Sequence, residues 1–159
     1  RVTVIDARAE GDSRAVAGRH AALARTAAAE AVPQALLSGG ELTARPAAGG
    51  EGGPNCDYAL ALGVALDGDP HIHAIACDTD GTDGSTDAAG AIVTPDLLAR
   101  AAAIGLSPAD TLAHSDSGRF FKRLGMAVMS GPTYTNVNDM RVMLVTPHID
   151  EKYRFFSGL

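Results

Sequence analysis

The stretch Ile75-Ala76-Cys77-Asp78-Thr79-Asp80-Gly81-Thr82-Asp83-Gly84-Ser85-Thr86-Asp87-Ala88-Ala89-Gly90 is the part of the sequence around which the fold is predicted. The apolar run 71–77 predicts a buried strand, and the turn after it carries four aspartates within ten positions. Two Asp-Gly pairs permit positive φ, so the backbone can curl and bring Asp80, Asp83 and Asp87 together. Crowded carboxylates repel one another unless a cation lies among them, which predicts a divalent metal or a metal–phosphate complex as the ligand.

A solvated acidic turn is the alternative for any loop of this composition, although open α/β sheets bind ligands at the carboxyl ends of their strands. An EF-hand calcium loop fits poorly, because Asp83 stands at the sixth position instead of glycine and Ala89 at the twelfth instead of glutamate. The pattern also resembles a haloacid-dehalogenase-type phosphatase, with Asp78 as nucleophile and Asp80 as acid. No paired aspartates follow a later strand to hold magnesium in that scheme.

A second polar segment, Ser38 to Glu41, follows the predicted strand 35–37. Its two glycines let backbone N–H groups point at a bound anion, although the spacing is not that of a P-loop. A tight turn into a strand 42–45 is the structural alternative. Further along, after the Gly/Ala-rich loop 46–54, Asn55 suits the N-cap of a helix, whose free N–H groups can receive an anion.

Helices are predicted from Ser13 through Glu30, from Asn55 to Leu66, from Thr94 to Gly105, from Ser107, and from Ser115 or Asp116. His20 within the first of these is expected to be a satisfied or exposed helix histidine. The last polar segment, 130–139, lies between predicted strands 126–129 and 140–145. Its short polar side chains also suit a purely structural turn.

Four collinear segments resemble one family. They are residues 37–43 (Leu-Ser-Gly-Gly-Glu-Leu-Thr), 52–55 (Gly-Gly-Pro-Asn), 80–91 and 130–139, the four motif segments. Together they are similar to the class of glycerate 2-kinases whose carboxy-terminal half is the MOFRL domain, also described as hydroxypyruvate reductases of tartrate utilisation. The resemblance implies that the whole protein transfers a phosphoryl group from ATP, with Mg²⁺, to the 2-hydroxyl of glycerate or another small hydroxy acid.

The resemblance also implies roles for individual residues. Asp80 and Asp83 are expected to bind the metal or order the substrate, with Asp87 supporting them. Ligand contacts are expected from Ser38, Gly39, Gly40, Glu41, Thr43, Asn55, Thr82, Thr133, Asn136 and Asn138. The family has arginine where this chain has Pro54, and no motif segment contains lysine or arginine. The chain alone is therefore expected to be inactive.

The composition limits the class of protein. At 159 residues the chain predicts a single domain, with 46% hydrophobic but only 4% aromatic residues, so alanine, valine and leucine must form the core. A net charge of −6 argues against nucleic acid as a partner. No apolar run reaches the ~18 residues of a membrane span, and Cys77 is expected to be a core residue in a reducing cytoplasm.

Strands and helices alternate, which predicts a layered α/β domain with a mixed, largely parallel sheet flanked by helices. The segments that follow Leu37, Cys77 and Met129 are expected to share one edge of that sheet. The chain begins at Arg1 without methionine, inside an apparent strand. Residues 1–159 are therefore expected to be one MOFRL-like domain at the carboxy-terminal end of a two-domain protein, whose cleft binds nucleotide and hydroxy acid. The sequence allows a homodimer without deciding the oligomeric state.

Two other functions stay open. Hydride transfer would need a nicotinamide site, but Gly39-Gly40 is not Gly-x-Gly-x-x-Gly, and no acidic residue follows about 20 positions later in a strand–helix–strand context. A noncatalytic ligand-binding domain is the second alternative, with Pro54 as the mark of its divergence.

Overall fold

The computed structural model describes residues 1–45 and 49–147, which form a six-stranded sheet with the strand order β1-β2-β6-β3-β4-β5. The strands are β1 (Val2–Asp12), β2 (Gln34–Thr43), β3 (Ile72–Asp78), β4 (Gly90–Val93), β5 (Ala127–Val128) and β6 (Asp139–Val145). The helices are α1 (Ser13–Ala28), α2 (Pro54–Leu66), α3 (Leu97–Ala103), α4 (Pro108–Ala113) and α5 (Ser117–Leu124). Residues 46–48, in the predicted Gly/Ala-rich loop, and 148–159 lie outside the described residues.

The predicted α/β architecture with a mixed sheet is confirmed. Parallel pairing is less extensive than expected: β1 and β2 are parallel, and the other strand pairs of the described residues are antiparallel. The reason is the position of β6, which inserts between β2 and β3 and runs antiparallel to both. This insertion brings the amino end of β6 beside the carboxyl end of β3 and beside the middle of β2, where Ser38 pairs with Arg141.

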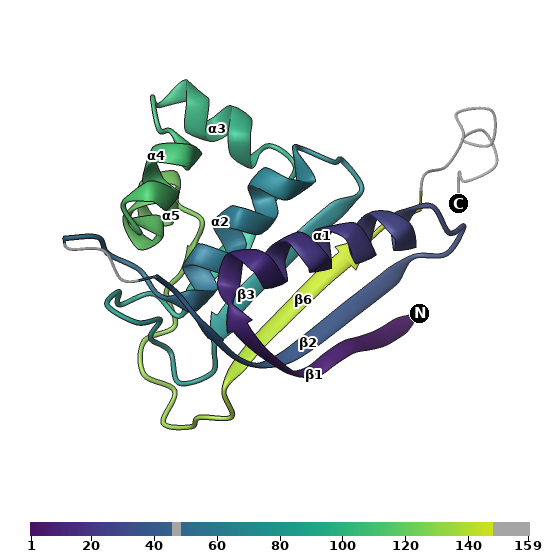
Figure 1. The fold of residues 1–159 in the computed structure, drawn as a ribbon, viewed down its shortest axis with the longest axis horizontal. Coiled ribbons are helices and arrows are strands. Elements are labelled where there is room, and N and C mark those ends of the chain that lie inside the picture. The colour runs from purple at the N-terminus through teal and green to yellow at the C-terminus, as the bar shows by residue number, and fades with distance from the viewer. Residues whose placement is uncertain (46–48, 148–159) are drawn as a thin grey trace.

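The helices α1 and α2 lie side by side in front of the sheet in Figure 1, with α3, α4 and α5 beyond the far side of α2. The core between them is rich in alanine, as the composition predicts, and its larger buried side chains include Leu60, Leu62, Phe120 and Phe121. Such small side chains let helix and sheet pack closely without voids. No helix of the described part of the chain is long and apolar enough to cross a membrane.

Several element boundaries differ from the sequence predictions. The N-cap of α1 is Asp12, whose carboxylate accepts hydrogen bonds from the backbone N–H groups of Arg14 and Ala15, and Ser13 is the first helical residue. The N-cap of α3 is Asp96 rather than Thr94. Ser107 caps α4 as predicted, through its hydroxyl oxygen and the backbone N–H of Asp110.

The side chain of His20 connects α1 to α2. It is buried, and its Nδ1 lies 2.8 Å from the hydroxyl oxygen of Tyr58. This confirms the expectation of a satisfied helix histidine. Burial lowers the pKa of His20 to about 4, because water no longer solvates the charged ring.

The low pKa of His20 predicts an acid-sensitive contribution to stability. Histidine in the unfolded chain titrates near 6.5, so between pH 6.5 and about 4 the unfolded chain binds a proton that the folded chain does not. The free energy of unfolding should therefore fall as the pH is lowered through this window, and should fall less in His20→Gln, which does not titrate. Urea unfolding at about pH 7, 5.5 and 4.5 measures both proteins. Identical losses would show that His20 titrates normally when folded.

Candidate functional site

The motif segments meet at one edge of the sheet, as predicted. Asp78 at the end of β3 pairs with Asp139 at the start of β6, and Ser38 of β2 pairs with Arg141. Because β6 is antiparallel to both neighbours, the acidic loop after β3 and the segment 130–139 before β6 leave the sheet at the same end. The amino end of α2 completes this group through contacts to Asp83 and Asp139.

Asp83 serves as the acceptor for the amino end of α2. Its Oδ1 accepts the backbone N–H of Asn55 at 2.9 Å and its Oδ2 accepts the backbone N–H of Cys56 at 2.8 Å. The helix N-cap is Gly53, which has no side chain to supply this acceptor, and Pro54 has no N–H to satisfy. The prediction of Asn55 as N-cap is therefore wrong, since Asn55 is the second helical residue.

The carboxylate of Asp83 fills the place where the sequence predicted a bound anion. Helix N-termini stabilise negative charge through free N–H groups and the helix dipole, and here that charge comes from the protein itself. The side chain is 1% exposed, and burial raises its pKa. Gly53 is required for this approach, because a Cβ there would lie 2.4 Å from Asp83 Oδ1.

Asn55 joins Asp83 to Asp139. Its side-chain Nδ2 donates to Asp139 Oδ1 at 2.7 Å and to Asp83 Oδ1 at 3.3 Å. The other oxygen of Asp139 accepts from the guanidinium of Arg141 and from the backbone N–H of Leu42. The sequence proposed Asn55 as a ligand contact, and in this geometry its amide nitrogen is fully engaged by the two carboxylates.

Arg141 ends this chain of contacts inside the protein. Its Nη1 donates to the carbonyl oxygen of Gly39 at 3.1 Å, and its guanidinium carbon lies 5.3 Å from the centroid of the Tyr58 ring. The side chain is 1% exposed, and burial lowers the pKa of Arg141 while the Asp139 carboxylate opposes that shift. Sequence analysis did not assign Arg141 a role. Its signal was the isolated arginine in an otherwise apolar strand.

Asp80 lies in a separate, more open place. Its Oδ1 accepts from the backbone N–H and the hydroxyl of Thr82, and its Oδ2 accepts from the side-chain amide of Asn136 at 3.2 Å. The backbone of Thr133 donates to the carbonyl oxygen of Asp80. Nearby, the carbonyl oxygen of Asn138 accepts from Thr79. These contacts join the acidic loop to the segment 130–139. The side chain of Asp80 is half-buried, and those of Thr82 and Asn136 are exposed.

Asp87 points to other partners. Its side chain is 72% exposed and forms an ion pair with Lys122, which also pairs with Glu51. The expected convergence of Asp80, Asp83 and Asp87 is therefore wrong. Within residues 1–45 and 49–147, no group of three or more His, Cys, Asp or Glu side chains could hold a metal ion. Both oxygens of Asp83 already accept hydrogen bonds from the amino end of α2, so its geometry favours a structural role, and the metal role of Asp80 and Asp83 stays a prediction.

The segment Ser38–Glu41 is not a loop. It continues β2 without a break, pairing with β1 on one side and, at Ser38, with β6 on the other. The predicted phosphate-type turn is therefore wrong. Gly40 has φ +93° and a Cβ there would lie 2.3 Å from the backbone of Ala9, so glycine is needed for the close approach of β1. Glu41 and Thr43 are exposed on this extended strand.

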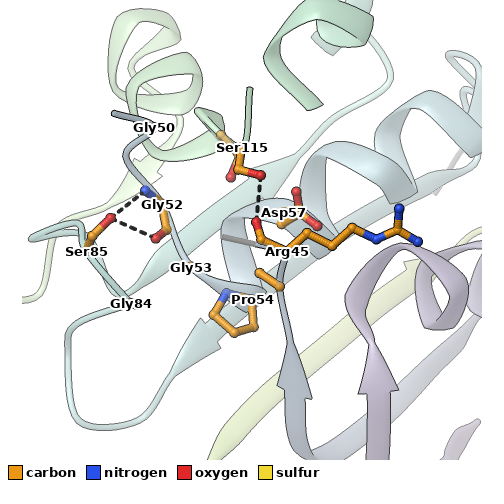
Figure 2. A pocket seen from close by; sticks show the side chains of 11 residues that line it. Arg45, Gly50, Gly52, Gly53, Pro54, Asp57, Gly84, Ser85 and Ser115 are labelled. Atoms are coloured by element: carbon orange, nitrogen blue, oxygen red, sulfur yellow. Dashed lines mark hydrogen bonds between the residues drawn. The ribbon is translucent and has the colours of Figure 1, made fainter. Parts of the chain in front are cut away.

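A pocket of roughly 420 Å³ lies beside the amino end of α2. Figure 2 shows Ser85 on one side, with its hydroxyl bonded to Gly52, and Ser115 on another, with its hydroxyl donating to the carbonyl oxygen of Arg45. The lining residues are Ala44, Arg45, Gly50, Gly52, Gly53, Pro54, Asp57, Gly84, Ser85, Ser115 and Ser117. Sequence analysis did not assign site roles to Arg45, Ser85 or Ser115. The glycines near these residues were the only sequence signal, because glycine permits two backbone segments to lie close together.

Asp116 and Glu51 connect two chain segments whose neighbouring residues line this pocket. The N-cap position of α5 is Asp116, as predicted, but its Oδ1 accepts from the backbone N–H of Glu51 at 2.8 Å and from Arg119, and its side chain makes no capping hydrogen bond. The backbone N–H of Gly118 returns a hydrogen bond to the carbonyl oxygen of Glu51. The glycine-rich loop is thus fixed to the start of α5.

A match to the MOFRL family covers residues 34–139, which is more than half of the chain and includes all four motif segments. The chain belongs to the MOFRL family. This assignment confirms the resemblance and leaves the calcium-loop and phosphatase interpretations without support.

Relatives of this MOFRL chain carry two kinds of name. A putative hydroxypyruvate reductase of Agrobacterium vitis is 46% identical over 142 residues, which is 86% of this chain and 32% of the relative. The D-glycerate 2-kinase of Thermotoga maritima is 40% identical over 113 residues, 71% of this chain and 27% of the relative. The chain therefore spans about a third of the length of the curated relatives it matches.

Solved structures agree with the fold. The crystal structure of a glycerate kinase from Thermotoga maritima matches with a TM-score of 0.87 at 32% identity, covering 92% of this chain and 36% of that one. The PH0495 protein from Pyrococcus horikoshii matches with a TM-score of 0.86 at 31% identity, covering 92% and 35%. The similarity thus extends over nearly all of the MOFRL chain.

Proposed function

We propose that this MOFRL chain is part of an ATP-dependent glycerate 2-kinase, which transfers a phosphoryl group to the 2-hydroxyl of glycerate or a similar hydroxy acid. The observation that carries the proposal is one buried network that joins all four motif segments. Asn55 contacts Asp83 and Asp139, and Arg141 connects Asp139 to Gly39. Together with relatives named glycerate kinase, this network supports a shared site rather than four unrelated turns.

The residues divide into two groups by exposure. Asp83 and Asn55 are buried and hydrogen-bonded, so they position the amino end of α2 and the glycine-rich loop beside it. Asp80 is half-buried and Thr133 and Asn136 are exposed, so these side chains are accessible to order a hydroxy acid or phosphate oxygens. Phosphoryl transfer depends mainly on such positioning and on neutralising charge.

The motif segments contain no lysine or arginine that could neutralise the transferring phosphate. Arg45 lines the pocket, but its side chain pairs with Asp12 at 3.3 Å. Pro54 stands where the glycerate 2-kinases that the chain resembles have arginine. ATP as co-substrate brings further negative charge that these residues do not neutralise. We therefore propose that the cationic groups come from the part of the full-length polypeptide outside residues 1–159, and that these residues alone are inactive.

The test is ATP-dependent formation of phosphoglycerate by the full-length protein. Asp80→Ala should lower kcat/KM by roughly thirtyfold, about 2 kcal/mol, because an ordering carboxylate is lost. Asp87→Ala should leave it within about threefold, since Asp87 pairs with Lys122 at the surface. Equal, small losses in both variants would contradict a role for the acidic loop.

Hydride transfer is tested in the same preparation, because one group of relatives is named hydroxypyruvate reductase. Oxidation of NADH or NADPH with hydroxypyruvate, without ATP-dependent product, would overturn the kinase proposal. A parallel sample of residues 1–159 alone should show neither activity. ATP-dependent turnover by this sample would refute the proposal that its cations come from elsewhere.

A further inference from the structure

One face of the sheet has no helix on it within the described residues. Figure 1 shows α1 and α2 in front of the sheet, and the side chains of β6 alternate accordingly. Its buried residues, such as Met143, face the helices, whereas Met140 and Leu144 are 44% and 56% exposed. Successive side chains of a strand point to opposite faces, so Met140, Val142 and Leu144 belong to the side away from α1 and α2.

Strand register shows that this side is aliphatic across five strands. Directly paired residues share a face, and the pairs place Val4, Leu37, Val142, Ile75 and Ile92 in one continuous row. The neighbouring row contains Val2, Ala35, Leu144 and His73. These nine residues are called the open face.

Antiparallel sheets that are solvated on one face usually carry polar side chains there. The open face instead carries valine, leucine and isoleucine, and Val2 and Val4 are 69% and 62% exposed. His73 is the one titratable residue of the two rows. Contiguous apolar surface of this kind marks a place where another layer packs, because domains bury the apolar face of a sheet against a second element.

We infer that the open face docks the part of the full-length polypeptide that lies outside residues 1–159. This rests on the proposed function only in that the full-length protein is taken to have the length of its relatives, about two-thirds of which this chain does not cover. A covalently attached segment reaches the face at a high effective concentration. A second copy would have to bring together two chains that each carry a net charge of −6.

Cysteine labelling of the full-length protein tests this docking. Leu144→Cys places a thiol on the open face, and Ile104→Cys, at a site 46% exposed beyond the end of α3, is the matched control. Alkylation of each peptide is followed by mass spectrometry and normalised to its rate in urea. The thiol at position 144 should react at least tenfold more slowly than that at position 104, at all protein concentrations and in the monomer.

Equal rates at the two positions in the folded protein would overturn the inference. Protection that disappears on dilution, with a mass of two chains by light scattering, would also overturn it and assign the open face to a second copy. Val4→Cys repeats the measurement in another strand in case Leu144→Cys fails to fold. The readout does not depend on phosphoryl transfer, so a failure of the kinase proposal leaves it interpretable.

Discussion

Replacing Arg141 with methionine is expected to lower the free energy of unfolding by about 3–5 kcal/mol. The guanidinium is 1% exposed and neutralises the buried carboxylate of Asp139. Methionine fills similar space against Tyr58 but supplies no charge and no donor to Gly39, so Asp139 stays buried without its ion-pair partner. Chemical unfolding at neutral pH measures the loss.

Two comparisons show whether the ion pair causes that loss. Arg123→Met removes an exposed arginine at the end of α5 and should change stability by less than about 0.5 kcal/mol. The double variant Arg141→Met/Asp139→Asn should lose about 1–3 kcal/mol less than the sum of the losses in the two single variants, because it no longer holds an unpaired charge. A loss in Arg141→Met no larger than in Arg123→Met would rule out a structural ion pair.

The general architecture followed from local patterns. The apolar run before Asp78 predicted β3, and the strand–helix alternation predicted an α/β domain whose polar segments share an edge. These predictions succeed because they depend on periodicity and on the direction of each strand. The pairing partners do not follow from periodicity, so the insertion of β6 between β2 and β3 was missed and parallel pairing was overestimated.

Glycine pairs misled the prediction of β2. Gly39 and Gly40 indicate a turn locally, yet pairing with β1 holds the chain extended through Thr43, and β6 pairs with it as far as Ser38. Pairing with β1 therefore overrides local preference, and Gly40 permits the close approach of β1. The sequence offered one local signal that was not used at α2: proline at the first helical position indicates a helix that begins at Pro54.

The partners of the aspartates could not be derived from spacing. Asp80, Asp83 and Asp87 are close in sequence, but they face Asn136, the amino end of α2 and Lys122 respectively. Each partner comes from a different distant element, so only the assembled fold separates a buried helix cap from an open loop carboxylate and a surface ion pair. This separation changes what a substitution at each position should do.

Asp83→Ala should lower the free energy of unfolding by about 3 kcal/mol. The substitution leaves the backbone N–H groups of Asn55 and Cys56 buried without an acceptor, and each such unsatisfied group costs about 1–3 kcal/mol. It also removes the negative charge at the amino end of α2. Asp87→Ala is the matched control from the same loop, and its unfolding midpoint should be that of the parent protein, because Asp87 is exposed.

A metal ligand would behave in the opposite way. Crowded metal-binding carboxylates repel each other without the metal, so removing one would leave the stability of the metal-free protein unchanged or raise it while abolishing activity. Asp83→Ala should instead lose stability with or without Mg²⁺, and the fraction that stays folded should retain more activity than Asp80→Ala. Chemical unfolding with and without Mg²⁺, followed by kcat/KM of the folded protein, distinguishes the two roles. If the Asp83→Ala variant were fully stable but inactive, Asp83 would have a direct role in the reaction instead of a structural one.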